Sequence, residues 1–282
     1  ITDFSITGGN TGGAFAVDAG GVISVADTTA IDYEGATSFA LTVTATDGIN
    51  TSAGQTVTIN LSDVNDTAPV VGTAGPFVLA ENSANTTPVG TVVATDADTI
   101  GGVTTFNITS GNTGTAFAID NSGAITVANS AALDRETNAG FTLTVTATDD
   151  AANESAGEDI VVNLTDLNDT APVVTPGQTF TVASSAPNNA VVGTVVATDA
   201  DTTGTVSGFS ITGSTFAIAA NGEITVSDNT GLLAGSPYTL TVTATDDASN
   251  VSLAETIVIT VTTGGETRWG SFNWGEADWQ QQ

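Results

Sequence analysis

The chain has 282 residues and a formal net charge of −29, because 31 acidic residues are balanced only by Arg135 and Arg268. It contains no Cys, Met or His, which excludes thiol and imidazole catalysis, Cys/His zinc sites, disulfides and, with so few basic residues, a nucleic-acid-binding surface. With 40% hydrophobic residues, the chain is too apolar to be a disordered polyacid, so we expect it to fold.

Targeting and membrane signals are missing from the sequence as it stands. No stretch has the roughly 20 apolar residues that a membrane-spanning helix needs, and the chain opens at Ile1 without a signal-peptide pattern. We expect a secreted or cell-surface extracellular protein that is processed or is part of a longer array.

Three copies of one unit make up most of the chain. LTVTATD begins at 41, 143 and 240, TVVATDAD begins at 91 and 194, and TAPVV follows DVND or DLND at 63–71 and 166–174. Apolar and polar residues alternate with period two between clusters of Gly, Asn and Asp, which is typical of strands and turns. Units of about 100 residues with about seven strands predict an all-β fold of tandem antiparallel Greek-key sandwiches, immunoglobulin-like and arranged in an elongated array.

The first repeat, residues 1–66, begins partway through the unit, because Ile1 aligns with Val103 of the second repeat. A sandwich without its first strands would expose sheet edges and core. Two explanations stay open: upstream residues complete the unit, or another chain donates the strands by β-augmentation. The second repeat, residues 67–169, is complete, and the third occupies residues 170–263.

Acidic residues recur in short phrases at equivalent places. These are AEN at 80–82, DYE and DRE at 32–34 and 134–136, DVND and DLND at 63–66 and 166–169, DAD at 96–98 and 199–201, and ATD at 45–47, 147–149 and 244–246. Groups of carboxylates beside Asn amides suit calcium, which takes about 6–8 oxygen ligands, better than magnesium. The alternative is that these aspartates only cap turns.

With these phrases the chain resembles the cadherin family of extracellular repeats, of the bacterial type, over roughly residues 1–262. The resemblance implies calcium binding between successive domains. Thr67 and Thr170 stand where the family usually has a second Asn. The implied ligands of the first junction are Asp32, Glu34, Asp63, Asn65, Asp66, Asp96, Asp98 and Asp149. Those of the second are Glu81, Asp134, Glu136, Asp166, Asn168, Asp169, Asp199, Asp201 and Asp246.

The third repeat keeps its DAD and ATD phrases but has ASS, LLAG and VTTGGE in place of the other three. The missing phrases are those that would serve a following junction. Independent drift would not sort ligands by junction, so this pattern favours calcium binding between domains and places the last such junction before the third repeat.

The composition changes in the tail, residues 264–282, which holds all three Trp residues of the chain: Trp269, Trp274 and Trp279. Their spacing of five fits neither face of a strand or a helix. The tail is either a docking peptide whose rings fill partner pockets, or a linker or the start of another domain.

The sequence therefore predicts a calcium-rigidified extracellular structural or adhesive protein, a stalk or filament subunit, and not an enzyme. Expected partners are other protein subunits, surface receptors or further copies of the chain, with glycans as a further candidate. The alternative is a carbohydrate-binding or accessory region of a larger secreted enzyme. A glycosidase centre, which needs two carboxylates beside a sugar cleft, is disfavoured because the acids fall at domain junctions and the repeats lack Trp.

Overall fold

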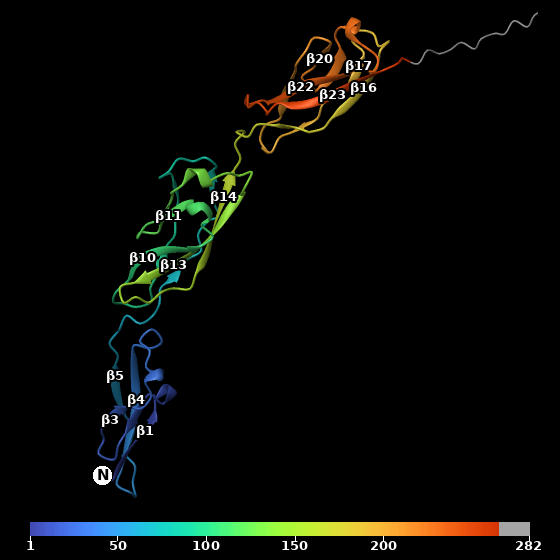
Figure 1. Ribbon diagram of the computed structural model, residues 1–282. Coiled ribbons are helices and arrows are strands. Elements are labelled where there is room, and N and C mark those ends of the chain that lie inside the picture. The colour runs from blue at the N-terminus through green and yellow to red at the C-terminus, as the bar shows by residue number, and fades with distance from the viewer. Residues whose placement is uncertain (265–282) are drawn as a thin grey trace, which may run out of the picture. The chain divides into compact units, whose positions relative to one another are not determined.

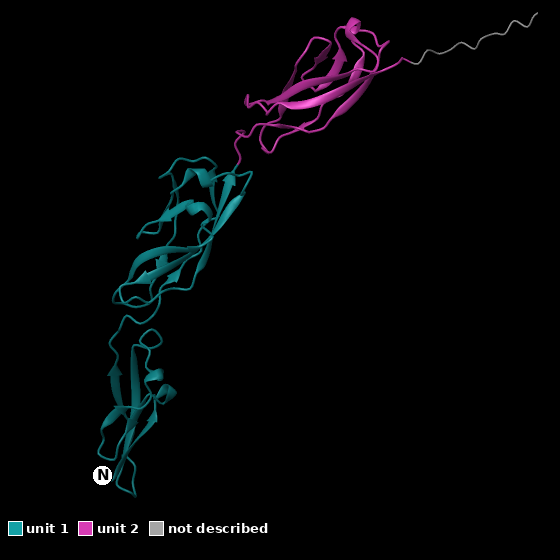
Figure 2. Ribbon diagram, in the orientation of Figure 1, with its two compact units in different colours: residues 1–165 teal, residues 166–282 magenta. Residues whose placement is uncertain are grey.

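The computed structural model describes residues 1–264 (Figure 1). The chain divides into two compact units, residues 1–165 and residues 166–282 (Figure 2). The regular elements of the described residues are strands and three-residue 3₁₀ helices, which confirms the all-β prediction. Within this part of the chain, no helix is long and apolar enough to cross a membrane.

The first repeat has a three-stranded sheet, ordered β1-β4-β5, and a two-stranded sheet, β2-β3. The strands β1, β4 and β5 lie side by side in Figure 1. All pairings are antiparallel. The strand bounds are β1 (Asp3–Gly8), β2 (Phe15–Val17), β3 (Ile23–Val25), β4 (Ser38–Thr46) and β5 (Gln55–Asn60).

The second repeat has a four-stranded sheet, β10-β13-β14-β7, a three-stranded sheet, β11-β12-β8, and the short pair β6-β9. Its strands are β6 (Val70–Val71), β7 (Phe77–Ala80), β8 (Pro88–Thr91), β9 (Ala94–Thr95), β10 (Val103–Ser110), β11 (Phe117–Ile119), β12 (Ala124–Val127), β13 (Gly140–Asp149) and β14 (Glu158–Thr165).

The third repeat has the same arrangement, with sheets β16-β23-β22-β19 and β17-β21-β20 and the pair β15-β18. Its strands are β15 (Val173–Val174), β16 (Thr179–Ala183), β17 (Val191–Thr194), β18 (Ala197–Thr198), β19 (Val206–Ile211), β20 (Phe216–Ile218), β21 (Glu223–Val226), β22 (Pro237–Asp246) and β23 (Glu255–Thr262).

One edge of the larger sheet departs from the antiparallel expectation. The strand β7 runs parallel to β14, and β16 runs parallel to β23. Because each pair joins the two ends of a repeat, no tight hairpin dictates their relative direction.

The division into repeats at 66/67 and 169/170 stays a prediction, and the Trp tail from residue 265 on lies outside the described residues.

Each repeat has its own hydrophobic cluster. On β13, the alternating Phe141, Leu143 and Val145 are 5% exposed or less, as the period-two pattern predicts. The ring of Phe141 meets that of Phe117 edge to face at 5.0 Å. Equivalent pairs occur in the other repeats, Phe15 with Phe39 and Phe216 with Tyr238, and such pairs add about 0.5–1.5 kcal/mol beyond the area they bury.

Candidate metal centre

Asp63 lies in the linker after β5, and the loop after β9 holds its carboxylate. Its Oδ2 accepts hydrogen bonds from the Thr99 N–H at 2.5 Å and from the Thr99 hydroxyl. In the 166–282 unit, Asp166 Oδ2 accepts in the same way from the Thr202 hydroxyl at 2.5 Å and the Thr203 N–H at 2.6 Å. The linker aspartate is therefore oriented by a loop more than thirty residues away in sequence.

The DAD phrase that follows β9 places Asp96 and Asp98 in one tight loop. The Asp98 N–H donates to Asp96 Oδ1 at 3.2 Å, and Asp98 Oδ2 accepts from the backbone N–H of Thr67 at 3.1 Å. The side chain of Asp98 is 9% exposed. Asp98 thus connects the DAD loop to the linker through a main-chain donor.

The ATD phrase ends β13, and Asp149 is 3% exposed there. Its Oδ1 accepts from the N–H groups of Ala151 and Asn153, and its Oδ2 accepts from the Asn153 amide, at 2.8–2.9 Å. Desolvation raises the pKa of Asp149, but these hydrogen bonds outweigh it and lower the pKa below its ordinary value. Asp149 is therefore a fixed anion at neutral pH.

These loops bring carboxylates into clusters whose oxygens lie within 4.8 Å of one another. In the 1–165 unit, Asp98 belongs to two of them. The unit contains the groups Glu34, Asp63 and Asp98; Asp96, Asp98 and Asp149; and Glu81, Asp134 and Glu136. The 166–282 unit contains the group Asp199, Asp201 and Asp246.

Several carboxylate oxygens of these clusters are buried without a hydrogen-bond partner among residues 1–264. They are Asp63 Oδ1, Asp96 Oδ2, Asp98 Oδ1, Asp199 Oδ2 and Asp201 Oδ1. The DAD loops of the two units thus leave the same atoms unpartnered. Buried polar atoms are normally satisfied, and an unpaired charged oxygen is costly to bury. The donor set fits a hard cation with oxygen ligands, and calcium is the cation that accepts several carboxylates in flexible geometry.

The electrostatics of the first cluster show the effect of crowded negative charge. The Thr99 hydroxyl, more than the Thr99 N–H, holds the pKa of Asp63 below its ordinary value against desolvation. The backbone N–H of Glu34 acts to lower the pKa of that residue, but desolvation and the charges of Asp63 and Asp98 outweigh it, so the pKa of Glu34 is raised. In the other unit, desolvation raises the pKa of Asp201, and the charge of Asp199 adds to the effect.

Other predicted ligands have turn or linker roles in the structure. Asp32 Oδ1 accepts from the Gly35 N–H at 3.1 Å, and its counterpart Asp134 accepts from the N–H of Thr137 at 2.9 Å while also belonging to a cluster. Within the described chain, Asp32, Asp66 and Asp169 lie in none of the carboxylate clusters.

Other hydrogen bonds hold the side-chain amides of the two linkers and the Glu of the AEN phrase. The amides of Asn65 and Asn168 donate to Asp150 at 2.6 Å and Asp247 at 2.7 Å. Glu81, only 2% exposed, accepts from the Arg135 N–H at 2.7 Å. The predicted docking residues Trp269, Trp274 and Trp279 lie outside the described residues.

The sequence prediction missed the residues that hold the linkers. Asp150 and Asp247 accept from the linker Asn amides, while Asn153 and Asn250 donate to the linker carbonyls of Asn65 and Asn168 at 3.3 and 3.1 Å. A signal for them exists, because the pattern DDxxN occurs at 149–153 and again at 246–250.

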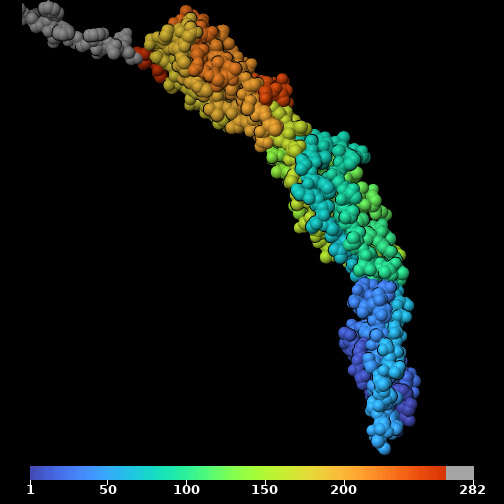
Figure 3. All heavy atoms as spheres, turned by 180° about the vertical axis from the view of Figure 1, so that it is seen from behind, coloured from blue at the N-terminus to red at the C-terminus, as the bar shows by residue number. Residues whose placement is uncertain are grey.

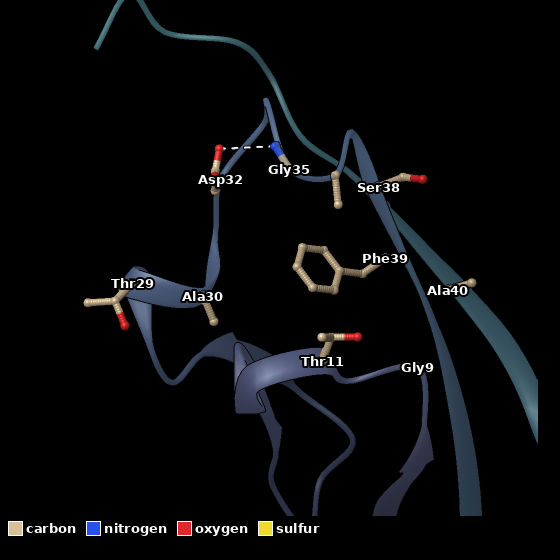
Figure 4. Close-up of a pocket in the computed structure, with 10 residues that line it drawn as sticks. Gly9, Thr11, Thr29, Ala30, Asp32, Gly35, Ser38, Phe39 and Ala40 are labelled. Atoms are coloured by element: carbon tan, nitrogen blue, oxygen red, sulfur yellow. Dashed lines mark hydrogen bonds between the residues drawn. The ribbon is translucent and has the colours of Figure 1, made fainter. Parts of the chain in front are cut away.

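A pocket of 480 Å³ lies in the first repeat, and its lining includes none of the clustered carboxylates (Figure 4). The ring of Phe39 faces it between Ala30 and Thr11. Asp32 is the one acidic residue in its lining, and its carboxylate is engaged with Gly35. The pocket therefore lacks the paired carboxylates that glycoside hydrolysis requires.

Comparisons with known proteins show what this chain is similar to. The Cadherin domain family model matches residues 76–165. Human Protocadherin Fat 1 is 36% identical over 182 residues, which is 62% of this chain and 4% of that protein. Human Cadherin-related family member 2 is 38% identical over 181 residues, 62% of this chain and 14% of that protein. The chain thus spans a small part of the length of these relatives.

Solved structures show the same fold. The crystal structure of mouse Cadherin-23 EC22-24 has a TM-score of 0.58 and 26% identity, covering 93% of this chain and 86% of that one. Mouse Protocadherin-24 EC1-3 has a TM-score of 0.54 and 22% identity, covering 92% and 90%. Cadherin domains are extracellular adhesion-type modules that generally bind Ca²⁺. The motifs, the tandem sandwiches and these matches together identify the chain as a cadherin-like tandem repeat protein.

Proposed function

We propose that this chain is a calcium-rigidified extracellular structural protein, a stalk or filament subunit. The observation that carries the proposal is the set of buried, unpartnered oxygens of Asp63, Asp96 and Asp98, which recurs at Asp199 and Asp201. A bound calcium ion would supply the positive charge that these oxygens lack. The chain's own part is to hold the oxygens in place through Thr99 and Thr67.

The proposed ligands of the first junction are those that the resemblance implies, with Asp98 central because it belongs to two clusters. Asp32, Asn65 and Asp66 are proposed as further ligands. For the second set, we propose that calcium binds oxygen ligands from two groups of residues. The first group is Glu81, Asp134 and Glu136, and the second is Asp166, Asn168, Asp169, Asp199, Asp201 and Asp246.

The proposed stiffening of the linkers results from neutralising the negative charge of the clustered carboxylates. Without a cation, neighbouring carboxylates repel one another and the linkers lose the contacts that order them; a bound cation removes the repulsion and ties linker to loop. A stiffened array would suit a stalk or filament, with other subunits, surface receptors or glycans as the partners to be tested. The Trp tail is proposed as the attachment segment.

The test measures calcium binding and stiffness on the same sample. Isothermal titration should detect binding at about 10⁻⁴–10⁻³ M, as in other extracellular modules, and small-angle scattering should show a narrower spread of conformations with calcium than with EGTA. Magnesium at equal concentration is the control for ionic strength. Identical scattering in calcium and in EGTA would refute rigidification. A glycan-array signal without any calcium effect would favour the carbohydrate-binding alternative.

A further inference from the structure

The side-chain amide of Asn168, in the linker that begins the 166–282 unit, is held by the loop after β22. Its Nδ2 donates to Asp247 Oδ1 at 2.7 Å, and the same oxygen accepts from the Thr205 N–H at 3.0 Å. Figure 3 shows this loop, between β22 and β23, in orange-red beside the yellow residues at the start of the unit. One carboxylate oxygen therefore joins the linker to two loops of the third repeat.

The backbone of Gly204 closes the other side of the Asn168 amide. Gly204 has a φ of +93°, and a Cβ placed on it would lie 2.0 Å from Asn168 Nδ2 and 2.8 Å from Asp247 Oδ1. Glycine adopts this left-handed conformation without steric cost, and here the amide also occupies the space that any side chain would need. We call Gly204 and Asp247 the amide socket of the third repeat.

The second repeat contains the same socket. Asn65 Nδ2 donates to Asp150 Oδ1 at 2.6 Å, and the Gly102 N–H donates to that oxygen at 3.2 Å. Gly101 has a φ of +80°, and a Cβ on it would lie 2.1 Å from Asn65 Nδ2 and 2.4 Å from Asp150 Oδ1. The combination of a linker Asn, a left-handed Gly and an acidic residue is therefore a repeated feature of the fold.

The socket determines which atom of the amide faces away from it. An ionised carboxylate can only accept hydrogen bonds, so the NH₂ group of Asn168 must face Asp247 and its Oδ1 must point elsewhere. The reversed amide would bring two partly negative oxygens together, which is repulsive. Asn168 Oδ1 is buried and has no hydrogen-bond partner among residues 1–264. The socket thus presents an oxygen whose orientation is fixed and whose lone pairs are available to a cation.

A second amide holds the main chain of the linker. Asn250 Nδ2 donates to Asn168 O at 3.1 Å and to Asp246 Oδ2 at 2.8 Å, and Asp246 belongs to a carboxylate cluster. Asn153 makes the corresponding bonds in the second repeat and also lies 3.4 Å from Asn65 Oδ1. The linker asparagine is therefore fixed at its backbone and at its side chain, next to a clustered acid.

We propose that Gly204 and Asp247, and likewise Gly101 and Asp150, are positioning residues for calcium. They hold the linker Asn with its side-chain oxygen toward the ion, and they do not bind the ion themselves. The inference rests on the proposed calcium function. Within the described chain, Asp150 and Asp247 lie in none of the carboxylate clusters, and the Oδ1 of each already accepts two hydrogen bonds. A change at Gly204, which removes no carboxylate and alters no charge, should therefore weaken calcium binding.

The main variant is Gly204→Ala, compared with the native full chain by isothermal titration with calcium. We expect the affinity of the second set of ligands to fall by about 10–100-fold, the range for residues that support metal ligands. The matched control is Gly235→Ala, because Gly235 has a similar φ of +82° but no atom within 4 Å of its added Cβ. The control should keep the native calcium affinity, and the first set of ligands is an internal reference in both chains.

Variants of Asp247 separate the loss of the acceptor from the loss of charge. Asp247→Ala removes the acceptor and should weaken calcium binding as Gly204→Ala does. Asp247→Asn keeps an oxygen that can accept from Asn168 and should restore most of the affinity. With terbium as the probe ion, luminescence decays in H₂O and D₂O count the bound waters, and Gly204→Ala should show additional bound water where the Asn168 oxygen has moved away.

A measurement without metal tests the socket itself. In EGTA, NMR should show that the side-chain amide protons of Asn168 exchange with solvent slowly in the native chain and faster in Gly204→Ala. Native calcium affinity in Gly204→Ala, or equal losses in Gly204→Ala and Gly235→Ala, would overturn the inference and leave the calcium function intact. A native chain that binds no calcium would refute the calcium function and this positioning role with it.

Discussion

The backbone N–H of Thr67 donates to the Asp98 carboxylate at 3.1 Å. This single bond ties the linker to the DAD loop and leaves the other oxygen of Asp98 buried without a partner among the described residues. In the 166–282 unit, Thr170 and Asp201 repeat the bond at 3.0 Å. In both units, a backbone N–H of the linker thus orients the carboxylate of the DAD loop, whose other oxygen forms no hydrogen bond within the described residues.

Replacing Asp98 with Asn should disable the proposed calcium site of the first junction, because Asp98 belongs to two clusters. We expect calcium affinity there to fall by at least about 10–100-fold, the range seen even when supporting residues of metal sites are lost. Titration calorimetry on the full chain measures the change in affinity and stoichiometry. Asp3→Asn on the exposed face of β1 has the same charge change and serves as the control; equal effects of the two variants would mean that only net charge matters.

Chelation should open the linkers to proteases. If calcium binds as proposed, its removal leaves the carboxylates around Asp63 and Asp98 unneutralised, so local opening near Asp66 and Asp169 becomes more frequent. Limited proteolysis with mass spectrometry should show cuts near these residues in EGTA and protection in calcium. Cleavage at the same sites and rates in both buffers would contradict the prediction.

Shortening the side chain at equivalent positions of two repeats should reduce stability by different amounts. Val127→Ala removes two methyl groups from a fully enclosed site, which costs about 1.6 kcal/mol at about 0.8 kcal/mol per group, plus a cavity contribution. Val25→Ala in the first repeat should cost far less, because Val25 is 53% exposed and Val127 is 1% exposed. Hydrogen exchange resolved by repeat measures both losses, and equal losses would show that Val25 is buried in solution.

The turn at Asp120 should lose stability in acid. The Ser122 hydroxyl, followed by the N–H groups of Ala124 and Ser122, holds the pKa of Asp120 below its ordinary value of 3.8. A lowered pKa in the folded state means that the charged turn is stabilising above the unfolded pKa and that this contribution disappears as the pH falls through the folded pKa.

The comparison with Asp120→Asn isolates this effect. The native chain should exceed the variant in thermal stability at pH 7, and the difference should shrink below about pH 4. The measurement is the melting temperature of both chains from pH 7 to pH 2 with EGTA present throughout. A difference that stays constant over this range would rule out the charge of Asp120 as its cause.

Much of the fold could be predicted from the sequence, because the alternation of apolar and polar residues marks the strands of each repeat. The alternation from Phe141 to Val145 places one face in the core, as the period-two pattern predicts. The parallel edge β7-β14 could not be predicted, because its partners are nearly a whole repeat apart and no local turn sets their direction.

The sequence by itself determined that this is a chain of repeated β-sandwiches whose acidic residues recur in a fixed order. Hydrophobic periodicity and motif spacing can be read locally along the sequence. Only the tertiary structure decided which oxygens are free to bind a cation. Thr99 reaches Asp63 across 36 residues, and Asp150 reaches Asn65 across 85. Whether a carboxylate oxygen is satisfied depends on which distant donors the folded loops bring to it, and that is a property of packing.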